Sequence, residues 1–305
     1  MHSIERKEKK IRDLVNHPWK LQKLLENKTK WNQLCASMDV IGDTQIAIND
    51  FFKLPAFSSN NGGYLFLYGL LQSFFLQQDA INHLSQALFN NPINWRIDYP
   101  ELFQIRELRN DTIGHPTKRG NDESFHFIAR YSISNGYFRL MSHYSDKQKN
   151  LFRDIIIKEL KEKQENSVIE ILDNVIKLME KEFEEHKNNF SKEKISELAN
   201  IGYSISKVYE GIYNNYELVE MNFTIIKTTI ESIKTEIKKR YGKISALQGV
   251  QDVIRRIDYI IERVEKWILE DKLFNNNDAE VFMDSFSDRF DELEEMLKEI
   301  DKEFE

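Results

Sequence analysis

The stretch YLFLYGLLQSFFLQQDAINHLSQALF, residues 64–89, opens with the longest apolar region of the chain. One glycine and two polar residues interrupt that region, which covers residues 64–75, and it stays short of the roughly 18 apolar residues of a membrane span. An Asn-Asn-Pro triplet at 90–92 then stops the pattern. The stretch predicts a long helix whose aromatic side chains belong to the core.

Helical patterns continue on both sides of this stretch. Before it, residues 31–52 predict a second, largely buried helix from the apolar residues Leu34, Met38, Ile41, Ile46, Ile48, Phe51 and Phe52. A polar loop that contains Pro55 and residues 58–63 separates the two helices. After it, residues 101–113 predict a third helix, which Gly114 would cap and Pro116 would not allow to continue.

Residues 124–144, SFHFIARYSISNGYFRLMSHY, break the helical pattern. Two aromatic and β-branched runs flank the pair Asn135-Gly136, the strongest short-range signal for a β-hairpin. From Ser145 to Glu305 the chain has no proline, and apolar residues recur at helical spacing. This second half predicts a long-helix bundle or coiled coil.

The patterns together predict an all-α protein with one small β-hairpin. Residues 1–30 would form a charged helical segment that breaks near Pro18, residues 31–145 a helical domain with the hairpin near 124–144, and residues 146–305 the long-helix domain. Such apolar stripes on long helices are packing faces far more often than cofactor sites.

Three features of the composition exclude some classes of protein: the cysteine count, the first residues and the distribution of charge. Cys35 is the only cysteine, which excludes an internal disulfide framework and a multi-cysteine zinc site. The start MHSIERKEKKIRDL lacks the apolar core of a signal peptide, so we expect a cytoplasmic protein with no membrane partner. Net charge is −7, but it is +3 through Ser145 and −10 beyond. The front half therefore leaves room for contact with RNA phosphates.

The segment ELRNDTIGHP, residues 107–116, carries the candidate chemistry. No P-loop glycine pattern, zinc spacing or serine-nucleophile elbow occurs in the sequence. Arg109, the polar Asn110 beside it and His115, placed late in a third helix after two apolar helices, resemble the signature of HEPN domains. These small helical domains occur in bacterial RNase toxins, anticodon nucleases and CRISPR effectors. The resemblance covers residues 31–145.

The resemblance implies a metal-independent endoribonuclease of toxin or anti-phage defence type, which leaves a 2′,3′-cyclic phosphate. RNA carries its own nucleophile, the 2′-hydroxyl, so the enzyme needs a base, an acid and stabilisation of phosphate charge. Histidine exchanges protons near neutral pH, and arginine offers a fork of donors that matches phosphate oxygens. We therefore expect Arg109, His115 and Asn110 to be catalytic, with no metal and no cofactor.

Helical geometry constrains this site. Six residues of α-helix turn through about 600°, so Arg109 and His115 would point about 120° apart on a continuous helix. Either His115 lies past the helix end and folds back, or a second subunit supplies its own pair. HEPN relatives use the second arrangement, so the resemblance implies a homodimer.

Other side chains are candidates for supporting roles. Asp79 and His83 lie four residues apart on one helix face and would either support the site, as would Asp111, or form a buried hydrogen-bonded pair. Lys118 and Arg119 follow the site on a loop, where they would contact the RNA backbone or remain solvated charges.

Structural alternatives exist for the two central residues as well. Arg109 would then form a salt bridge with Asp111 or Glu107, and His115 would be a turn histidine at a helix C-terminus. The competing functions are a non-catalytic HEPN-like adaptor, which binds a partner protein or nucleic acid, and a coiled-coil structural protein. In the leading hypothesis the acidic C-terminal helices serve assembly, or bind an antitoxin or regulatory partner.

Overall fold

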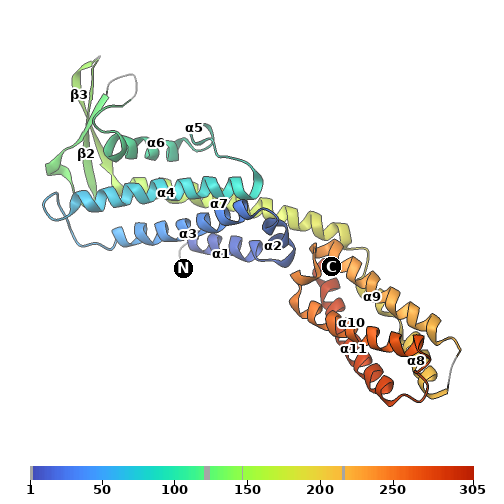
Figure 1. The fold of residues 1–305 in the computed structure, drawn as a ribbon. Helices are drawn as coiled ribbons and strands as arrows, with labels where there is room; N and C mark the ends of the chain where they lie inside the picture. Colours follow the sequence, from blue (N-terminus) through green and yellow to red (C-terminus); the bar gives the residue numbers. More distant parts are fainter. Residues whose placement is uncertain (1–2, 120–123, 146, 215–216) are drawn as a thin grey trace. The chain divides into compact units, whose positions relative to one another are not determined.

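The computed structural model describes residues 3–119, 124–145, 147–214 and 217–305, and it is mostly helical, as predicted (Figure 1). The contacts divide the chain into two compact units. The first unit contains residues 1–15 and 27–179, and the second contains residues 16–26 and 180–305. The predicted break near Pro18 is present, because one helix ends at Val15 and the next begins at Pro18.

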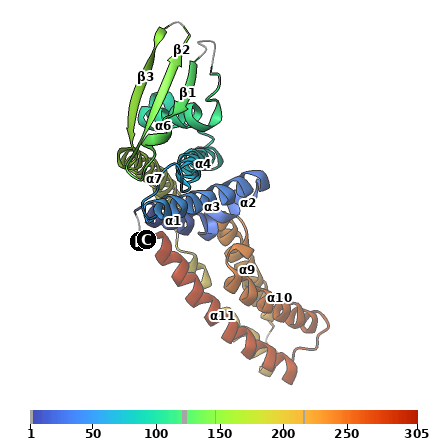
Figure 2. The same ribbon diagram turned by 90° about the vertical axis from the view of Figure 1, so that its left-hand side faces the viewer.

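The helices of the first unit are α1 (Ser3–Val15), α3 (Lys28–Phe51), α4 (Gly63–Phe89), α5 (Trp95–Asp98), α6 (Pro100–Arg109) and the beginning of α7 (Ile157–Phe190). The two apolar stretches of the sequence form α3 and α4, which lie side by side (Figures 1 and 2). The Asn27 side chain caps α3 by accepting a hydrogen bond from the backbone N–H of Lys30 at 3.1 Å. Asn90 ends α4 in the left-handed conformation, with φ at 56°.

Glycine is required where α4 begins. A methyl group on Gly63 would lie 2.5 Å from the carbonyl oxygen of Ser58 and 2.7 Å from Cγ2 of Ile133. The Asn135 side chain fastens the same loop, because its Oδ1 accepts a hydrogen bond from the backbone N–H of Phe57 at 2.8 Å. The start of α4 is therefore packed against the segment that connects the first two strands.

A chain of buried glutamines ties α3, α4 and α7 together. Gln77 donates to Oε1 of Gln45 at 3.0 Å, Gln164 donates to Oε1 of Gln77 at 2.9 Å, and Gln78 donates to Oε1 of Gln164 at 2.8 Å. All four side chains are buried, so each hydrogen bond offsets the cost of removing an amide from water. Such a network fixes the axial register of the three helices, which apolar contacts alone specify weakly.

The sheet of the first unit has three antiparallel strands, β1 (Ser124–Ile128), β2 (Tyr137–Tyr144) and β3 (Lys147–Ile156), in the order β1-β2-β3. The predicted hairpin corresponds to the pairing of β1 with β2, where Ile128 faces Leu140. Its connection is longer than a tight Asn-Gly turn, because a 3₁₀ turn (Arg130–Ser132) comes first. Gly136 does not have the positive φ that such a tight turn requires.

The third strand corrects the predicted domain boundary. Residues 147–156 were expected to begin the long-helix domain, but they pair with β2, with Met141 facing Phe152. The unit boundary falls at Met179, inside α7, and not near residue 145. The charged segment 1–30 does not stand alone either, because α1 belongs to the first unit and α2 (Pro18–Leu25) to the second.

The second unit is an all-helical bundle in its described part. Its elements are α2, the end of α7, the 3₁₀ turn Ile195–Ala199, α8 (Gly202–Asn214), α9 (Val219–Tyr241), the 3₁₀ turn Ile244–Ala246, α10 (Gln248–Leu269) and α11 (Asn277–Phe304). Buried residues of α11 recur at alternating steps of four and three, which predicts a continuous packing stripe: Ala279, Met283, Phe286, Phe290, Leu293, Leu297, Ile300 and Phe304. Across the described ranges, none of the helices is both long and apolar enough for a membrane crossing.

Candidate functional site

The candidate site lies where α6 changes into a π-helix. Residues Asn110–Gly114 form this π-helix directly after Arg109, the last residue of α6. The backbone N–H of His115 closes it by donating to the carbonyl oxygen of Asn110 at 2.8 Å. The sequence predicted an ordinary α-helix through residue 113, so the wider turn is a finding of the structure. Short π-helices of this kind occur frequently at functional sites.

Arg109 is held in place by neutral partners. Its Nε and Nη2 donate to Oε1 of Gln72 at 3.1 and 2.9 Å, and its Nη1 donates to Oδ1 of Asn110 at 3.2 Å. The guanidinium carbon lies 4.4 Å from the ring centroid of Phe75, which α4 presents together with Gln72. Within the part of the chain that the structure describes, no carboxylate pairs with this guanidinium.

The acidic residues that were expected to pair with Arg109 pair with Arg119 instead. Nη2 of Arg119 lies 2.6 Å from Oε1 of Glu107, and Nη1 forms an ion pair with the carboxylate of Asp111. The salt-bridge alternative for Arg109 is therefore not what the structure contains. Arg119 is half-buried in these ion pairs, which argues against its predicted role as a free loop charge for RNA.

Asp79 and His83 do not form the predicted pair. Oδ1 of Asp79 lies 2.8 Å from Nη1 of Arg106, whose guanidinium lies 4.2 Å from the centroid of Phe75. Asp79 therefore pairs with Arg106 and not with Arg109; the two arginines both lie against the ring of Phe75. His83 is exposed on α4, and Lys118 is exposed after the π-helix.

His115 lies past the helix end, which is the first part of one of the two predicted solutions. It is exposed, with φ at −141° and ψ at 52°, and Pro116 follows it. The carbonyl oxygen of Pro116 accepts a hydrogen bond from the backbone N–H of His126 at 2.8 Å. The segment after the site is therefore anchored to β1 while the imidazole of His115 faces solvent.

The side chain of Arg109 extends along the π-helix toward His115. An ideal Cβ built on Gly114 would lie 2.9 Å from Nη1 of Arg109 and 3.2 Å from Oδ1 of Asn110. The guanidinium therefore reaches the residue that immediately precedes His115.

A second charged cluster joins the π-helix to the sheet. The carboxylate of Asp111 is buried and lies 3.5 Å from Nε2 of His126 and 4.0 Å from Nη2 of Arg153, besides its ion pair with Arg119. Burial lowers the pKa of His126, and the nearby charge of Asp111 opposes that effect. The ring nitrogens of His126 also lie 2.9 and 3.1 Å from the hydroxyls of Ser142 and Ser124. Asp111 therefore anchors the π-helix to the sheet and does not contact Arg109.

The sequence did not identify Gln72 and Phe75 as partners of the site. Gln72 was visible only as a polar interruption of the apolar stretch 64–75, and Phe75 only as one of its aromatic residues. Comparison of the chain with models of known families, with characterised proteins and with solved structures gave no match. In the described ranges, no three potential metal ligands of the His, Cys, Asp and Glu types are grouped together.

Proposed function

We propose that the chain is a metal-independent endoribonuclease of the HEPN type, a toxin or anti-phage enzyme that acts in the cytoplasm. The observation that carries the proposal is the environment of Arg109. Its guanidinium is oriented by Gln72, Asn110 and Phe75, and points along the π-helix that leads to the exposed His115. Cleavage of an RNA phosphodiester needs a positioned cation and a group that exchanges protons, which Arg109 and His115 would supply.

The donor geometry of Arg109 supports binding of a phosphate. A guanidinium has five N–H groups. Three of them donate to Gln72 and Asn110, so one N–H on Nη1 and one on Nη2 have no partner among the described residues. Free N–H groups of a guanidinium are well suited to hydrogen bonds with phosphate oxygens. Phe75 covers one face of the guanidinium and leaves its edge for the substrate.

The proposed reaction is an internal transfer at phosphorus. A base removes the proton of the 2′-hydroxyl, the 2′-oxygen bonds to phosphorus, and the bond from phosphorus to the 5′-oxygen breaks. An acid gives a proton to that leaving oxygen, so the products are a 2′,3′-cyclic phosphate and a 5′-hydroxyl. His115 carries the proton and Arg109 stabilises the charge on the non-bridging oxygens. Asn110 acts on the arginine and is a positioning residue.

A homodimer would complete the site. The reaction needs a base and an acid, and each chain offers one His115. Two copies around a twofold axis would supply both, and twofold assembly is the commonest symmetry of soluble oligomers. The second unit, which contains 30 acidic and 21 basic residues, would repel RNA and is better suited to assembly or to an antitoxin or other regulatory partner.

Purified protein incubated with total RNA in EDTA tests the proposal. We expect cleavage by the wild type, ends that resist ligation because the phosphate is cyclic, and loss of cleavage in Arg109→Gln and His115→Ala. Arg130→Gln and His83→Ala are matched controls, because both residues are exposed and lie outside the site. Circular dichroism checks that each variant keeps its helical content.

The outcomes separate the candidate functions. Cleavage that persists in either site variant, or products with free 3′-hydroxyls, would refute the proposed site. Activity that depends on added Mg²⁺ would refute the metal-independent chemistry. RNA binding by the wild type without cleavage would favour the adaptor, a non-catalytic protein on the same scaffold.

A further inference from the structure

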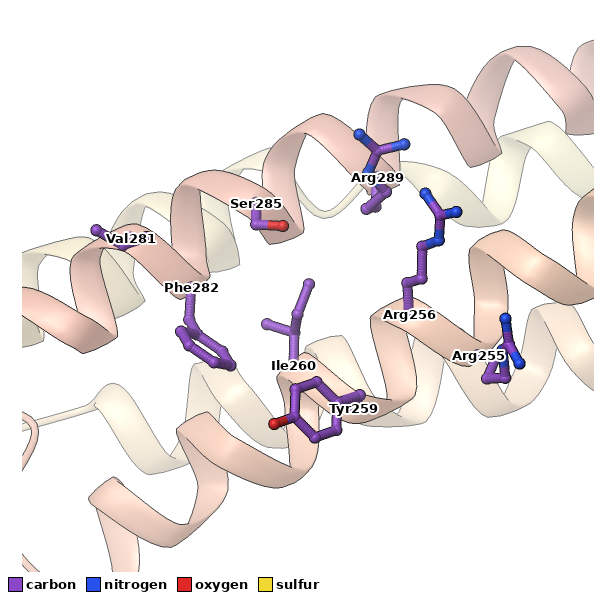
Figure 3. Close-up of a pocket in the computed structure, with 8 residues that line it drawn as sticks. All are labelled: Arg255, Arg256, Tyr259, Ile260, Val281, Phe282, Ser285 and Arg289. Carbon is purple, nitrogen blue, oxygen red and sulfur yellow. The ribbon is translucent and has the colours of Figure 1, made fainter.

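A cavity of about 690 Å³ lies between α10 and α11 in the second unit (Figure 3). Its size falls within the range of about 300–1,000 Å³ that is usual for small-molecule sites. Ile260 and Phe282 form apolar parts of its lining, and Tyr259, a residue that is 51% exposed, lies beside them. Arg255, Arg256 and Arg289 contribute guanidinium groups to the same cavity.

The positive charge of this cavity contrasts with the rest of the unit. The second unit has 30 acidic and 21 basic residues, and so a net charge of −9. It contains five arginines, and three of them line this one cavity. A concentration of arginines in an acidic domain is not explained by the average composition and indicates an anionic ligand.

The arginines are not neutralised equally. Among the described residues, Arg256 has no ion pair and no hydrogen bond from its side chain. Arg289 is paired with Glu292, and Arg255 lies 3.5 Å from Asp252 at the exposed rim. Both Arg256 and Arg289 line the cavity, and Figure 3 shows their side chains toward the same end of it. An anion bound at that end would accept hydrogen bonds from guanidinium groups, of which that of Arg256 has no counter-ion among the described residues.

The other end of the cavity is aromatic. The rings of Tyr259 and Phe282 have centroids 6.1 Å apart and are tilted by 41°, so they pack against each other and form one aromatic surface of the cavity. Figure 3 shows both rings at the end away from Arg256 and Arg289, with Ser285 on the helix between them. The lining therefore matches a molecule with a planar ring at one end and an anionic group at the other.

We propose that this cavity binds a nucleotide, with its phosphates between Arg256 and Arg289 and its base against Tyr259 and Phe282. The proposal is independent of the ribonuclease site, because all of its residues belong to the second unit. The acidic helical unit would then bind an anionic ligand, which its net negative charge did not suggest.

Isothermal titration calorimetry of the 305-residue chain with three probes tests the proposal. ATP supplies ring and phosphates, inorganic triphosphate supplies the charge alone, and adenosine supplies the ring alone. We expect ATP to bind at least tenfold more tightly than either fragment. Arg256→Gln and Arg289→Gln should each weaken ATP binding about tenfold, because each removes a charged hydrogen-bond donor.

Lys266→Gln is the matched control, because it removes one positive charge from α10 outside the cavity, where Lys266 is exposed. Its affinity for ATP should equal that of the wild type. Absence of saturable ATP binding would overturn the proposal, as would equal affinities for ATP and inorganic triphosphate. Equal weakening by Lys266→Gln and by Arg256→Gln would also overturn it, since it would show an effect of net charge only.

Discussion

Replacement of Gly114 by alanine is the sharpest test of how Arg109 is positioned. The new Cβ would lie 2.9 Å from Nη1 of Arg109, whereas ordinary contacts of a Cβ begin at 3.4 Å. The end of the arginine must therefore move by about half an ångström, and its hydrogen bond to Asn110 must lengthen or break. A displacement of about 1 Å in a catalytic group costs about 100-fold in rate, so we expect about a tenfold loss of RNA cleavage.

The fold should survive this substitution. The obstructing atoms belong to the flexible end of an arginine, and alanine is favoured over glycine in a helix by roughly 0.5–1 kcal/mol. The free energy of unfolding should therefore change by less than about 1 kcal/mol. Gly69→Ala is the control, since Gly69 lies on α4 close to Gln72 and an added Cβ would meet nothing within 4 Å. That variant should cleave RNA at the wild-type rate.

Two measurements would refute the reasoning about Gly114. The first is a Gly114→Ala protein that keeps its helical content and cleaves RNA as fast as the wild type, because the position of Arg109 would then not limit the rate. The second is a further loss of cleavage when Gly114→Ala is combined with Arg109→Gln. If Gly114→Ala acts only through the guanidinium, it should cause no further loss once that group has been removed.

Three further predictions concern stability and assembly. Arg119→Gln removes two ion pairs from Glu107 and the buried Asp111, so the free energy of unfolding measured by urea denaturation should fall by roughly 2–3 kcal/mol. Burial lowers the pKa of His126 and of His186, so below about pH 6.5 the unfolded chain binds protons more readily than the folded chain. The Tm should therefore fall as pH is lowered from about 7 to 5 and change little above 7, and the fall should be smaller in His126→Gln. Light scattering should show a dimer, and specific activity should fall on dilution; a fully active monomer would exclude the composite site.

The sequence predicted the elements in which one face is buried and apolar and the other is exposed and polar. Residues 31–52 and 64–89 have apolar faces because α3 and α4 pack against each other, and the predicted ends agree with Phe51 and Phe89. Strand β3 was not predicted, because its sequence lacks a strand pattern and only its pairing with β2 identifies it. Leu151 and Phe152, neighbours on opposite faces, are 51% and 58% exposed, so the strand shows no alternation of apolar and polar residues.

The sequence indicated which residues are candidates for a site, but not the geometry around them. Arg109 and His115 were found from their spacing and from the Gly-His-Pro end of the helix, and the structure places His115 beyond that end. The π-helix was not predictable, because its wider turn leaves no periodic signal in five residues. The partners Gln72 and Phe75 depend on how α6 packs on α4, which a single sequence does not specify.

The contrast among three neighbouring arginines gives the strongest argument for function at this site. Arg106 is paired with Asp79, and Arg119 is paired with Asp111 and Glu107, so both contribute to the fold in the ordinary way. Arg109 lies between them in the sequence, is half-buried, and has only an amide pair and an aromatic ring as partners. A partly desolvated charge without a counter-ion is less stable than a paired one. Departures from such a local rule are expected at functional sites, and under the proposed function an RNA phosphate would be the counter-ion of Arg109.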